Sequence, residues 1–132
     1  MKNIISILLL LTLSLFAEHK NSYISQEILD SDIPIVDVRT EWEWKEGGIL
    51  EDAIPIVFFS EKGQPLIDSF LKQLNEKVDT TKPFAIICHT GSRTAVIAPW
   101  LAKQFNYDVT NLSGGMEYAT KALKLKTVPY KK

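Results

Sequence analysis

One short loop holds the residues whose chemistry stands out in this chain. Cys88 is the only cysteine, and Arg93 follows it after four residues in the stretch CHTGSR. A cysteine thiolate is a strong nucleophile, and backbone N–H groups in a loop that leads into a helix favour the anionic form. Arginine adds a permanent cation whose planar fork suits a sulfur or phosphorus oxyanion. The loop therefore predicts nucleophilic chemistry at Cys88 beside an anion-binding cradle.

Other interpretations of Cys88 have to be weighed against this one. An unpaired cysteine in an exported protein can form an intermolecular bridge, and one that follows the apolar residues AII can be a small core residue. Gly91 and Arg93 favour a reactive thiol instead. Glycine permits a positive φ in a tight loop, and a cation at the start of a helix gains nothing from the helix dipole.

The apolar pattern predicts alternating strands and helices around this loop. Short runs of branched side chains predict strands, and apolar positions at steps of three and four predict amphipathic helices. Pro99 is expected to kink or split the helix that contains it. In that helix, Ala95, Ala98, Ala102 and Phe105 fall on one face at helical spacing. The expected strands are 33–38, 84–88 and 107–112, with a further extended segment at 53–59, and the expected helices are 42–46, 65–78, 91–105 and 116–124.

Strands that alternate with helices predict an α/β domain with a mainly parallel central sheet flanked by helices. Thr40 is expected to cap the helix at 42–46, and Gly47 and Gly48 to end it. In such a sheet, ligands collect at the carboxyl ends of the strands. Cys88 occupies that position, because it ends the buried run FAIIC.

Three motifs then resemble, in order and spacing, those of the single-domain rhodaneses. They are DVR at 37–39, CHTGSR at 88–93 and NLSGGMEYA at 111–119, and we expect one rhodanese-like domain over residues 23–125. The resemblance implies a sulfurtransferase that moves a sulfane sulfur from a donor such as thiosulfate to a thiophilic acceptor, cyanide or a thiol. The sulfur would travel as a Cys88 persulfide. No metal and no organic cofactor are implied.

The resemblance also implies roles for the neighbouring residues. Cys88 would be the catalytic nucleophile, and the loop amides would stabilise the anionic outer sulfur of the persulfide. Asp37 and Arg39 resemble the family's strand-end pair, which we interpret as holding the active-site loop in place. The residues expected to form the substrate-binding cradle are His89, Thr90, Gly91, Ser92 and Arg93.

The length of the loop separates this chemistry from related reactions. Protein tyrosine phosphatases and low-molecular-weight arsenate reductases place a longer loop between cysteine and arginine. The shorter cradle here fits a persulfide better than a tetrahedral phosphoryl group, so phosphatase or arsenate chemistry is a minor alternative. Thiosulfate-using rhodaneses carry cations at the positions of His89 and Thr90. Only a protonated His89 can supply one here, which leaves the preferred donor open.

A second class of function also stays open. A domain of this kind can serve as a non-turnover sulfur carrier or as a rhodanese-like binding module in a periplasmic sulfur relay, because fold does not fix function. The partner would then be a sulfur-relay protein in addition to a small sulfur donor and an acceptor. A single cysteine fits either function.

The start of the chain predicts export. Lys2 is followed by an uncharged run from Asn3 to Ala17, which is typical of a secretory signal peptide over residues 1–17. The run is shorter than the roughly 20 residues that span a bilayer, so a retained anchor is the less favoured alternative. We expect a periplasmic or secreted protein that meets the membrane only through this segment.

Charge points to no further partner. The 132 residues carry a formal net charge of -1, which gives no reason to expect nucleic-acid binding. An acidic patch and a basic end are both interpreted as solvated faces. The patch comprises Glu41, Glu43, Glu46, Glu51 and Asp52, and the basic end comprises Lys121, Lys124, Lys126, Lys131 and Lys132.

Overall fold

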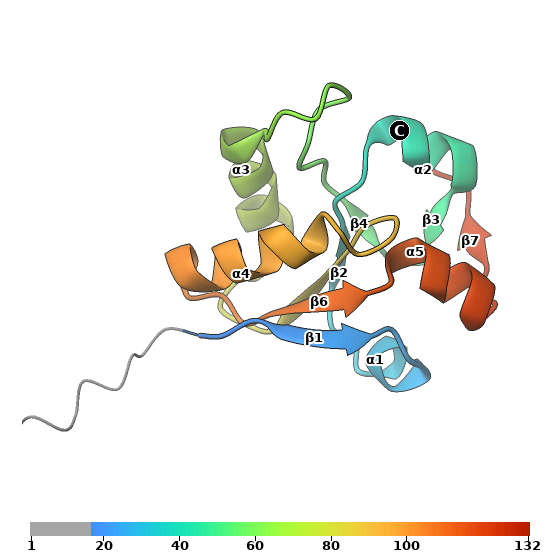
Figure 1. Cartoon of the computed structure of the whole chain (residues 1–132), viewed down its shortest axis with the longest axis horizontal. Helices are drawn as coiled ribbons and strands as arrows, with labels where there is room; N and C mark the ends of the chain where they lie inside the picture. Colours follow the sequence, from blue (N-terminus) through green and yellow to red (C-terminus); the bar gives the residue numbers. More distant parts are fainter. Residues whose placement is uncertain (1–16) are drawn as a thin grey trace, which may run out of the picture.

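The structure is a computed structural model that describes residues 17–132 (Figure 1), so the predicted signal peptide lies outside the described residues except for Ala17. The elements are β1 (Lys20–Tyr23), α1 (Gln26–Asp30), β2 (Ile35–Asp37), α2 (Glu41–Gly47), β3 (Ile49–Leu50), β4 (Ile54–Pro55), α3 (Ile67–Lys77), β5 (Phe84–Ile87), α4 (Thr94–Phe105), β6 (Val109–Ser113), α5 (Gly115–Glu117), the π-helical turn η2 (Tyr118–Ala122) and β7 (Thr127–Val128). Within the described part, no helix combines the length and the apolar character needed to cross a membrane.

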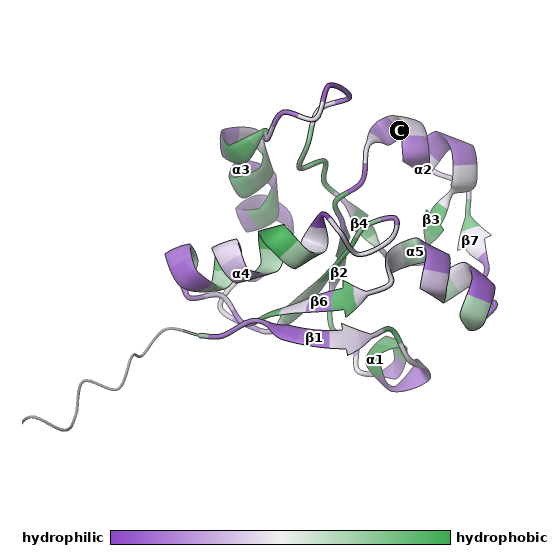
Figure 2. Ribbon diagram, in the orientation of Figure 1, coloured by the Kyte–Doolittle hydropathy of each residue, from purple (hydrophilic) through white to green (hydrophobic). Residues whose placement is uncertain are grey.

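Five strands form one sheet in the order β1-β6-β5-β2-β4, and every neighbouring pair is parallel. This confirms the predicted α/β class and places β5, which leads to Cys88, at the centre. β3 and β7 form a separate antiparallel pair. Helices α3 and α4 cover one face of the sheet, and α1 and α5 lie on the other (Figure 1). Hydrophobic residues gather in the inner strands, while the edge strand β1 is largely hydrophilic (Figure 2).

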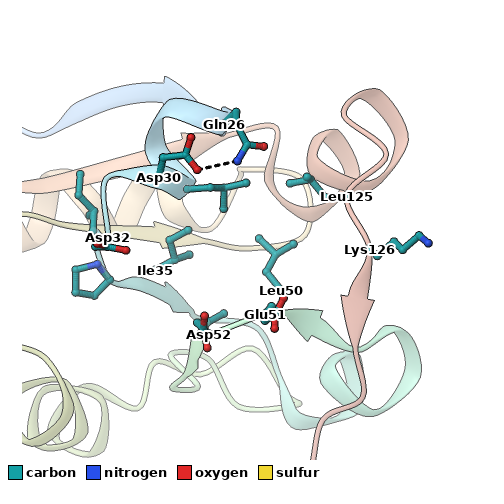
Figure 3. Close-up of a pocket in the computed structure, with 13 residues that line it drawn as sticks. Gln26, Asp30, Asp32, Ile35, Leu50, Glu51, Asp52, Leu125 and Lys126 are labelled. Carbon is teal, nitrogen blue, oxygen red and sulfur yellow. Dashed lines mark hydrogen bonds between the residues drawn. The ribbon is translucent and has the colours of Figure 1, made fainter.

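The α1 side of the sheet has its own small core and a cavity. Buried side chains here include Leu50 and Leu112, and Leu125 packs against them from the C-terminal segment. A cavity of about 550 Å³ opens beside this cluster, with an acidic rim that includes Asp30 and Asp52 (Figure 3). It lies where β2 and β4 begin, at the end of the sheet opposite Cys88, because the strands are parallel.

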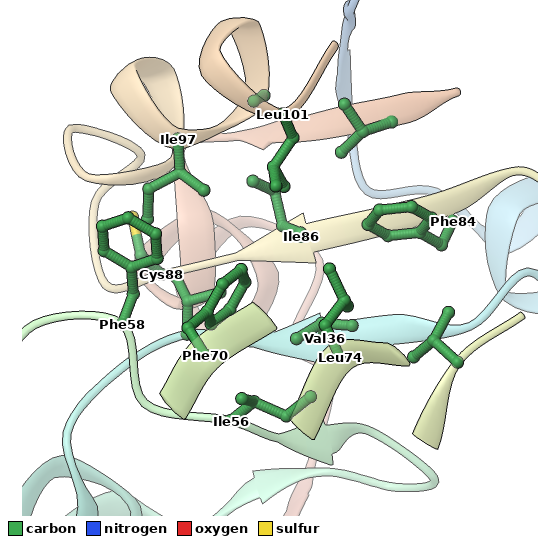
Figure 4. Packing of buried hydrophobic residues seen from close by; sticks show 14 of the residues in the cluster. Val36, Ile56, Phe58, Phe70, Leu74, Phe84, Ile86, Cys88, Ile97 and Leu101 are labelled. Atoms are coloured by element: carbon green, nitrogen blue, oxygen red, sulfur yellow. The ribbon is translucent and has the colours of Figure 1, made fainter. Parts of the chain in front are cut away.

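The larger core lies between the sheet, α3 and α4. Phe70 and Leu74 of α3 are fully buried, and Phe70 packs edge-on against Phe58 with ring centroids 4.8 Å apart. Ile86 of β5 and Ile97 of α4 complete the packing around them (Figure 4). Cys88 belongs to the same cluster. The sulfur of Cys88 therefore lies at the border of the larger core.

The helix that follows the cysteine loop departs from the sequence prediction. α4 is one continuous helix, so Pro99 does not split it. The proline lacks the N–H that would bond to the carbonyl of Ala95, and Ala95 is exposed, where water can satisfy that carbonyl. Of the four residues that share one face by their spacing, Ala98 and Ala102 are buried, whereas Ala95 and Phe105 are exposed. The larger apolar residues bury more surface and set the inner face instead, which is formed by Thr94, Ile97, Ala98, Leu101 and Ala102.

Other expected elements are shorter than predicted or divided. Only Ile54–Pro55 of the extended segment 53–59 forms a strand, and the expected helix at 116–124 is divided between α5 and the π-helical turn that ends at Ala122. The helix at 42–46 is confirmed with its predicted ends. Thr40 caps it, and Gly48 follows it with φ 74°.

The packing of Phe70 gives a test of the core. We expect Phe70→Ala to lower the free energy of unfolding by about 3–5 kcal/mol, because the buried ring leaves a cavity that its neighbours cannot fill. Val96→Ala, at a position 65% exposed on α4, should change it by less than about 0.5 kcal/mol. Urea denaturation of both variants measures the difference, and equal stabilities would contradict the assignment of the core.

Candidate active site

Cys88 follows β5 directly and lies at the carboxyl end of the central strand. Its side chain is fully buried. The Gly91 N–H donates a hydrogen bond to Cys88 Sγ at 3.2 Å, and Thr94 Oγ1 lies 3.5 Å from the same sulfur. Two groups that can donate hydrogen bonds therefore face the sulfur from the side where α4 begins. Both favour negative charge on it.

Thr94 was not predicted as a site residue. It is fully buried in the first turn of α4, and its hydroxyl also reaches the Gly91 carbonyl oxygen at 3.3 Å. A hydroxyl has one hydrogen, so donation to Cys88 Sγ and donation to Gly91 exclude each other. Thr94 can thus serve the sulfur when the sulfur is anionic and the loop backbone when it is not.

The segment that begins with the double glycine after β6 packs against the backbone of the cysteine loop. The Met116 N–H donates to the Cys88 carbonyl oxygen at 2.8 Å, and the Glu117 N–H donates to that of His89 at 2.9 Å. A Cβ atom on Gly115 would lie 2.5 Å from the Cys88 carbonyl oxygen, and φ at Gly115 is 58°. Only glycine allows this approach, so the backbone of the segment GGME packs directly against the backbone of the cysteine loop (Figure 1).

Arg93 is held by a carboxylate rather than left open. Arg93 Nη1 donates to Glu43 Oε2 at 2.8 Å, and Nη2 donates to Glu43 Oε1 at 2.6 Å. Glu43 also accepts from the N–H and the hydroxyl of Thr40, which completes a capping box on α2. One carboxylate therefore fixes the start of α2 and ties α2 to the cysteine loop.

Both partners of this pair are locked in their charged forms. Burial works against ionisation of Glu43, yet hydrogen bonds from Arg93 and Thr40 and the charge of Arg93 lower its pKa from 4.5 to about 2. The hydrogen bonds to Glu43 raise the pKa of Arg93 above its ordinary value, although burial opposes this. The interpretation of Glu43 as part of a solvated acidic face was therefore wrong.

Of the two roles of Glu43, the sequence can predict the capping of α2 but not the ion pair with Arg93. The spacing Thr40-x-x-Glu43 is that of a capping box and can be recognised from the sequence alone. The contact with Arg93 joins residues 50 positions apart and depends on the packing of α2 beside the loop.

Asp37 and Arg39 form a second, deeper ion pair next to the cysteine. Arg39 Nε donates to Asp37 Oδ1 at 3.0 Å, and Nη2 donates to Asp37 Oδ2 at 2.8 Å. Arg39 Nη2 also donates to the Gly48 carbonyl oxygen at 2.8 Å. Asp37 is paired with Ile87 in the sheet, one residue before Cys88. The pair thus fixes the end of α2 directly, through the bond to Gly48. It contacts the cysteine loop only indirectly, because Asp37 is paired in the sheet with Ile87, which precedes Cys88.

A cavity of about 520 Å³ lies between the cysteine loop and α2. Among the cradle residues, His89, Thr90 and Arg93 line it, whereas Gly91 reaches the sulfur through its backbone and Ser92 is exposed beside Thr90. The remaining wall is Arg39, Trp42, Glu43, Glu46 and Gly47. Within residues 17–132, no group of three or more histidine, cysteine or acidic side chains is placed to hold a metal ion.

Comparison with known proteins shows similarity in sequence over most of the chain. The family model described as the rhodanese-like domain matches residues 20–122. A protein of Rickettsia prowazekii is 36% identical over 93 residues, which is 68% of this chain and 74% of that protein. Rhodanese-like domain-containing protein 17 of Arabidopsis thaliana is 28% identical over 94 residues, 69% of this chain and 60% of that protein.

Solved structures share the fold. The structure of Rv0390 from M. tuberculosis matches with a TM-score of 0.61 at 21% identity and covers 76% of this chain and 80% of its own. A rhodanese-like domain protein from Staphylococcus aureus matches with a TM-score of 0.55 at 24% identity, covering 76% of this chain and 89% of its own.

The contact under the loop predicts the effect of a single methyl group. We expect Gly115→Ala to lower the free energy of unfolding by about 1–3 kcal/mol, since Cβ meets backbone atoms and φ is positive. We also expect Cys88 to react faster with iodoacetamide, because the loop loses its support. Gly47→Ala is the matched control, as nothing lies within 4 Å of its Cβ position. Equal effects of the two substitutions would contradict the fit described here.

The Glu43–Arg93 pair predicts a pH dependence of stability. The pKa of Glu43 is lower in the folded protein than its ordinary value of 4.5, so its stabilising effect is present above pH 4.5 and is lost as the pH falls toward 2. Wild type should therefore melt several degrees above Glu43→Gln at neutral pH, and the gap should close between pH 4.5 and pH 2. Thermal denaturation followed by circular dichroism measures this, and a gap that is constant with pH would refute it.

Proposed function

This chain belongs to the rhodanese-like domain family, and on that premise we propose that it is a sulfurtransferase that carries a sulfane sulfur as a persulfide on Cys88. One observation carries the proposal. Cys88 Sγ stands at the end of the central strand and accepts a hydrogen bond from the Gly91 N–H at 3.2 Å, inside a loop that borders a cavity. A buried sulfur with donors aimed at it is suited to hold negative charge.

The first step loads the cysteine. The Cys88 thiolate attacks the outer sulfur of a donor, which is the terminal sulfur in thiosulfate. A bond forms between Cys88 Sγ and that sulfur, while the S–S bond of the donor breaks and its electron pair leaves with sulfite. The product is a Cys88 persulfide anion, so no proton has to move.

The second step discharges it. Cyanide, or an acceptor thiolate, attacks the outer sulfur, and the bond to Cys88 Sγ breaks with its electron pair returning to the cysteine. Thiocyanate or an acceptor persulfide leaves, and the thiolate is restored. The Gly91 N–H and the Thr94 hydroxyl hold charge on Sγ at the start and at the end of this cycle.

The loop also controls access. Cys88 has no exposed surface, so a donor reaches it from the cavity past His89 and Thr90, which are both exposed. A small donor, or a flexible segment of a partner that presents its sulfur on a narrow stem, meets this requirement. The carrier alternative uses the same loading step and differs only in what receives the sulfur.

The test is the intact mass of the protein after exposure to thiosulfate and, separately, to an alkyl persulfide, followed by cyanide. We expect a gain of one sulfur atom that is lost on addition of cyanide. Cys88→Ser should gain no sulfur and should keep its thermal stability, because the change replaces one buried atom.

The outcomes separate the candidate functions. Gain of sulfur by Cys88→Ser, or no gain by the wild type with any donor, would refute the proposal. A persulfide that forms but transfers only to a protein thiol, with negligible turnover of small molecules, would identify a sulfur carrier.

A further inference from the structure

The charges around the cavity are nearly all paired with one another. Two guanidinium groups reach its wall. Arg39 makes a bidentate pair with buried Asp37, and Arg93 makes a bidentate pair with Glu43. Glu46 also lines the cavity and forms no ion pair within residues 17–132. The site therefore holds two cations against three carboxylates, and the Cys88 thiolate adds a further negative charge.

This balance bears on the donor that the site can accept. Thiosulfate brings two negative charges to a thiolate, and both guanidinium groups that line the cavity are already paired with carboxylates. An anion would have to displace Glu43 from Arg93, which is joined to it by two hydrogen bonds of 2.8 and 2.6 Å. His89 supplies a cation only when protonated. A donor with one charge or none meets a smaller repulsion.

Glu43 is not free to move aside. Its Oε2 atom accepts from the Thr40 N–H at 2.9 Å and from the Thr40 hydroxyl at 3.0 Å, in addition to Arg93. Release of Arg93 by movement of Glu43 would break the capping box of α2. The carboxylate is also ionised throughout the physiological range, as its lowered pKa shows.

We propose that Glu43 determines the donor preference of this site: by holding Arg93 it disfavours dianionic donors such as thiosulfate and favours persulfides of uncharged alkyl groups, which carry at most one negative charge. The inference rests on the proposed function. In the loading step, the Cys88 thiolate attacks the outer sulfur of R–S–SH. The Sγ–S bond forms, the S–S bond of the donor breaks, and the electron pair leaves on RS⁻ while the hydrogen stays on the transferred sulfur.

The experiment compares donors in variants matched for charge. Glu43→Gln removes the negative charge and keeps a side chain that still completes a capping box. Glu46→Gln removes one negative charge from the same cavity and leaves the Glu43–Arg93 pair intact. Glu41→Gln removes one negative charge from the same helix outside the cavity, where Glu41 pairs with Lys45.

The readout is the ratio of kcat/KM for thiosulfate to kcat/KM for 2-hydroxyethyl persulfide, with cyanide as acceptor. A ratio within one preparation does not depend on the fraction of folded protein.

We expect Glu43→Gln to raise this ratio about tenfold, because an unpaired Arg93 attracts the dianion. Glu46→Gln should raise it by no more than about threefold, since it changes the field without freeing a cation. Glu41→Gln should leave it unchanged. An unchanged or lower ratio in Glu43→Gln, or an equal rise in Glu43→Gln and Glu46→Gln, would overturn the assignment.

A second measurement needs no substitution. In the wild type, kcat/KM for thiosulfate should stay flat or rise when ionic strength increases from about 0.01 to 0.15 M, because salt screens repulsion. A steep fall would reveal an available cation and would overturn the proposal. If neither donor transfers sulfur to the wild type, the proposed function itself has failed, which is distinct from a transfer that shows no dependence on Glu43.

Discussion

The close approach between the Gly114–Gly115 turn and the cysteine loop is the constraint on which the site depends. The backbone N–H groups of Met116 and Glu117 in α5 donate hydrogen bonds to the carbonyl oxygens of Cys88 and His89, and these two bonds fix the backbone of the loop. Gly91, with φ 98°, then turns the chain so that its N–H faces Cys88 Sγ. A Cβ on Gly91 would lie 2.9 Å from the Gly114 backbone nitrogen, so glycines on both segments are required by one contact.

Helix α2 completes the site from the other side through an ion pair near its start and a hydrogen bond just after its end. Glu43, near its start, holds Arg93 of the loop, and the Gly48 carbonyl after its end accepts from Arg39 beside β2. The helix is thus tied to two neighbouring strand ends. The same contacts leave the cavity without an unpaired guanidinium. The hydrogen bonds that fix α2 against the cysteine loop therefore also determine the proposed donor preference of the site.

Sequence patterns predicted the central sheet, the helix from Ile67 to Lys77 and the position of Cys88, because these depend on local apolar periodicity. They did not predict the edge strand at Lys20–Tyr23, which is polar and is held by pairing with β6, or the Glu43–Arg93 pair, which is a tertiary contact. They placed Ala95 and Phe105 on one face of α4 with two buried alanines, whereas the buried face of the helix also holds Ile97 and Leu101 and leaves Ala95 and Phe105 exposed. Export through residues 1–17 stays a prediction.

The most direct test of the central claim is a crystal structure of the protein after it has been loaded with sulfur from an alkyl persulfide. The account predicts one additional sulfur atom on Cys88 Sγ, on the cavity side of the loop and within hydrogen-bond distance of loop amides between His89 and Arg93. An unmodified Cys88 in protein whose mass shows added sulfur would contradict it. An outer sulfur turned into the core, away from those amides, would contradict it equally.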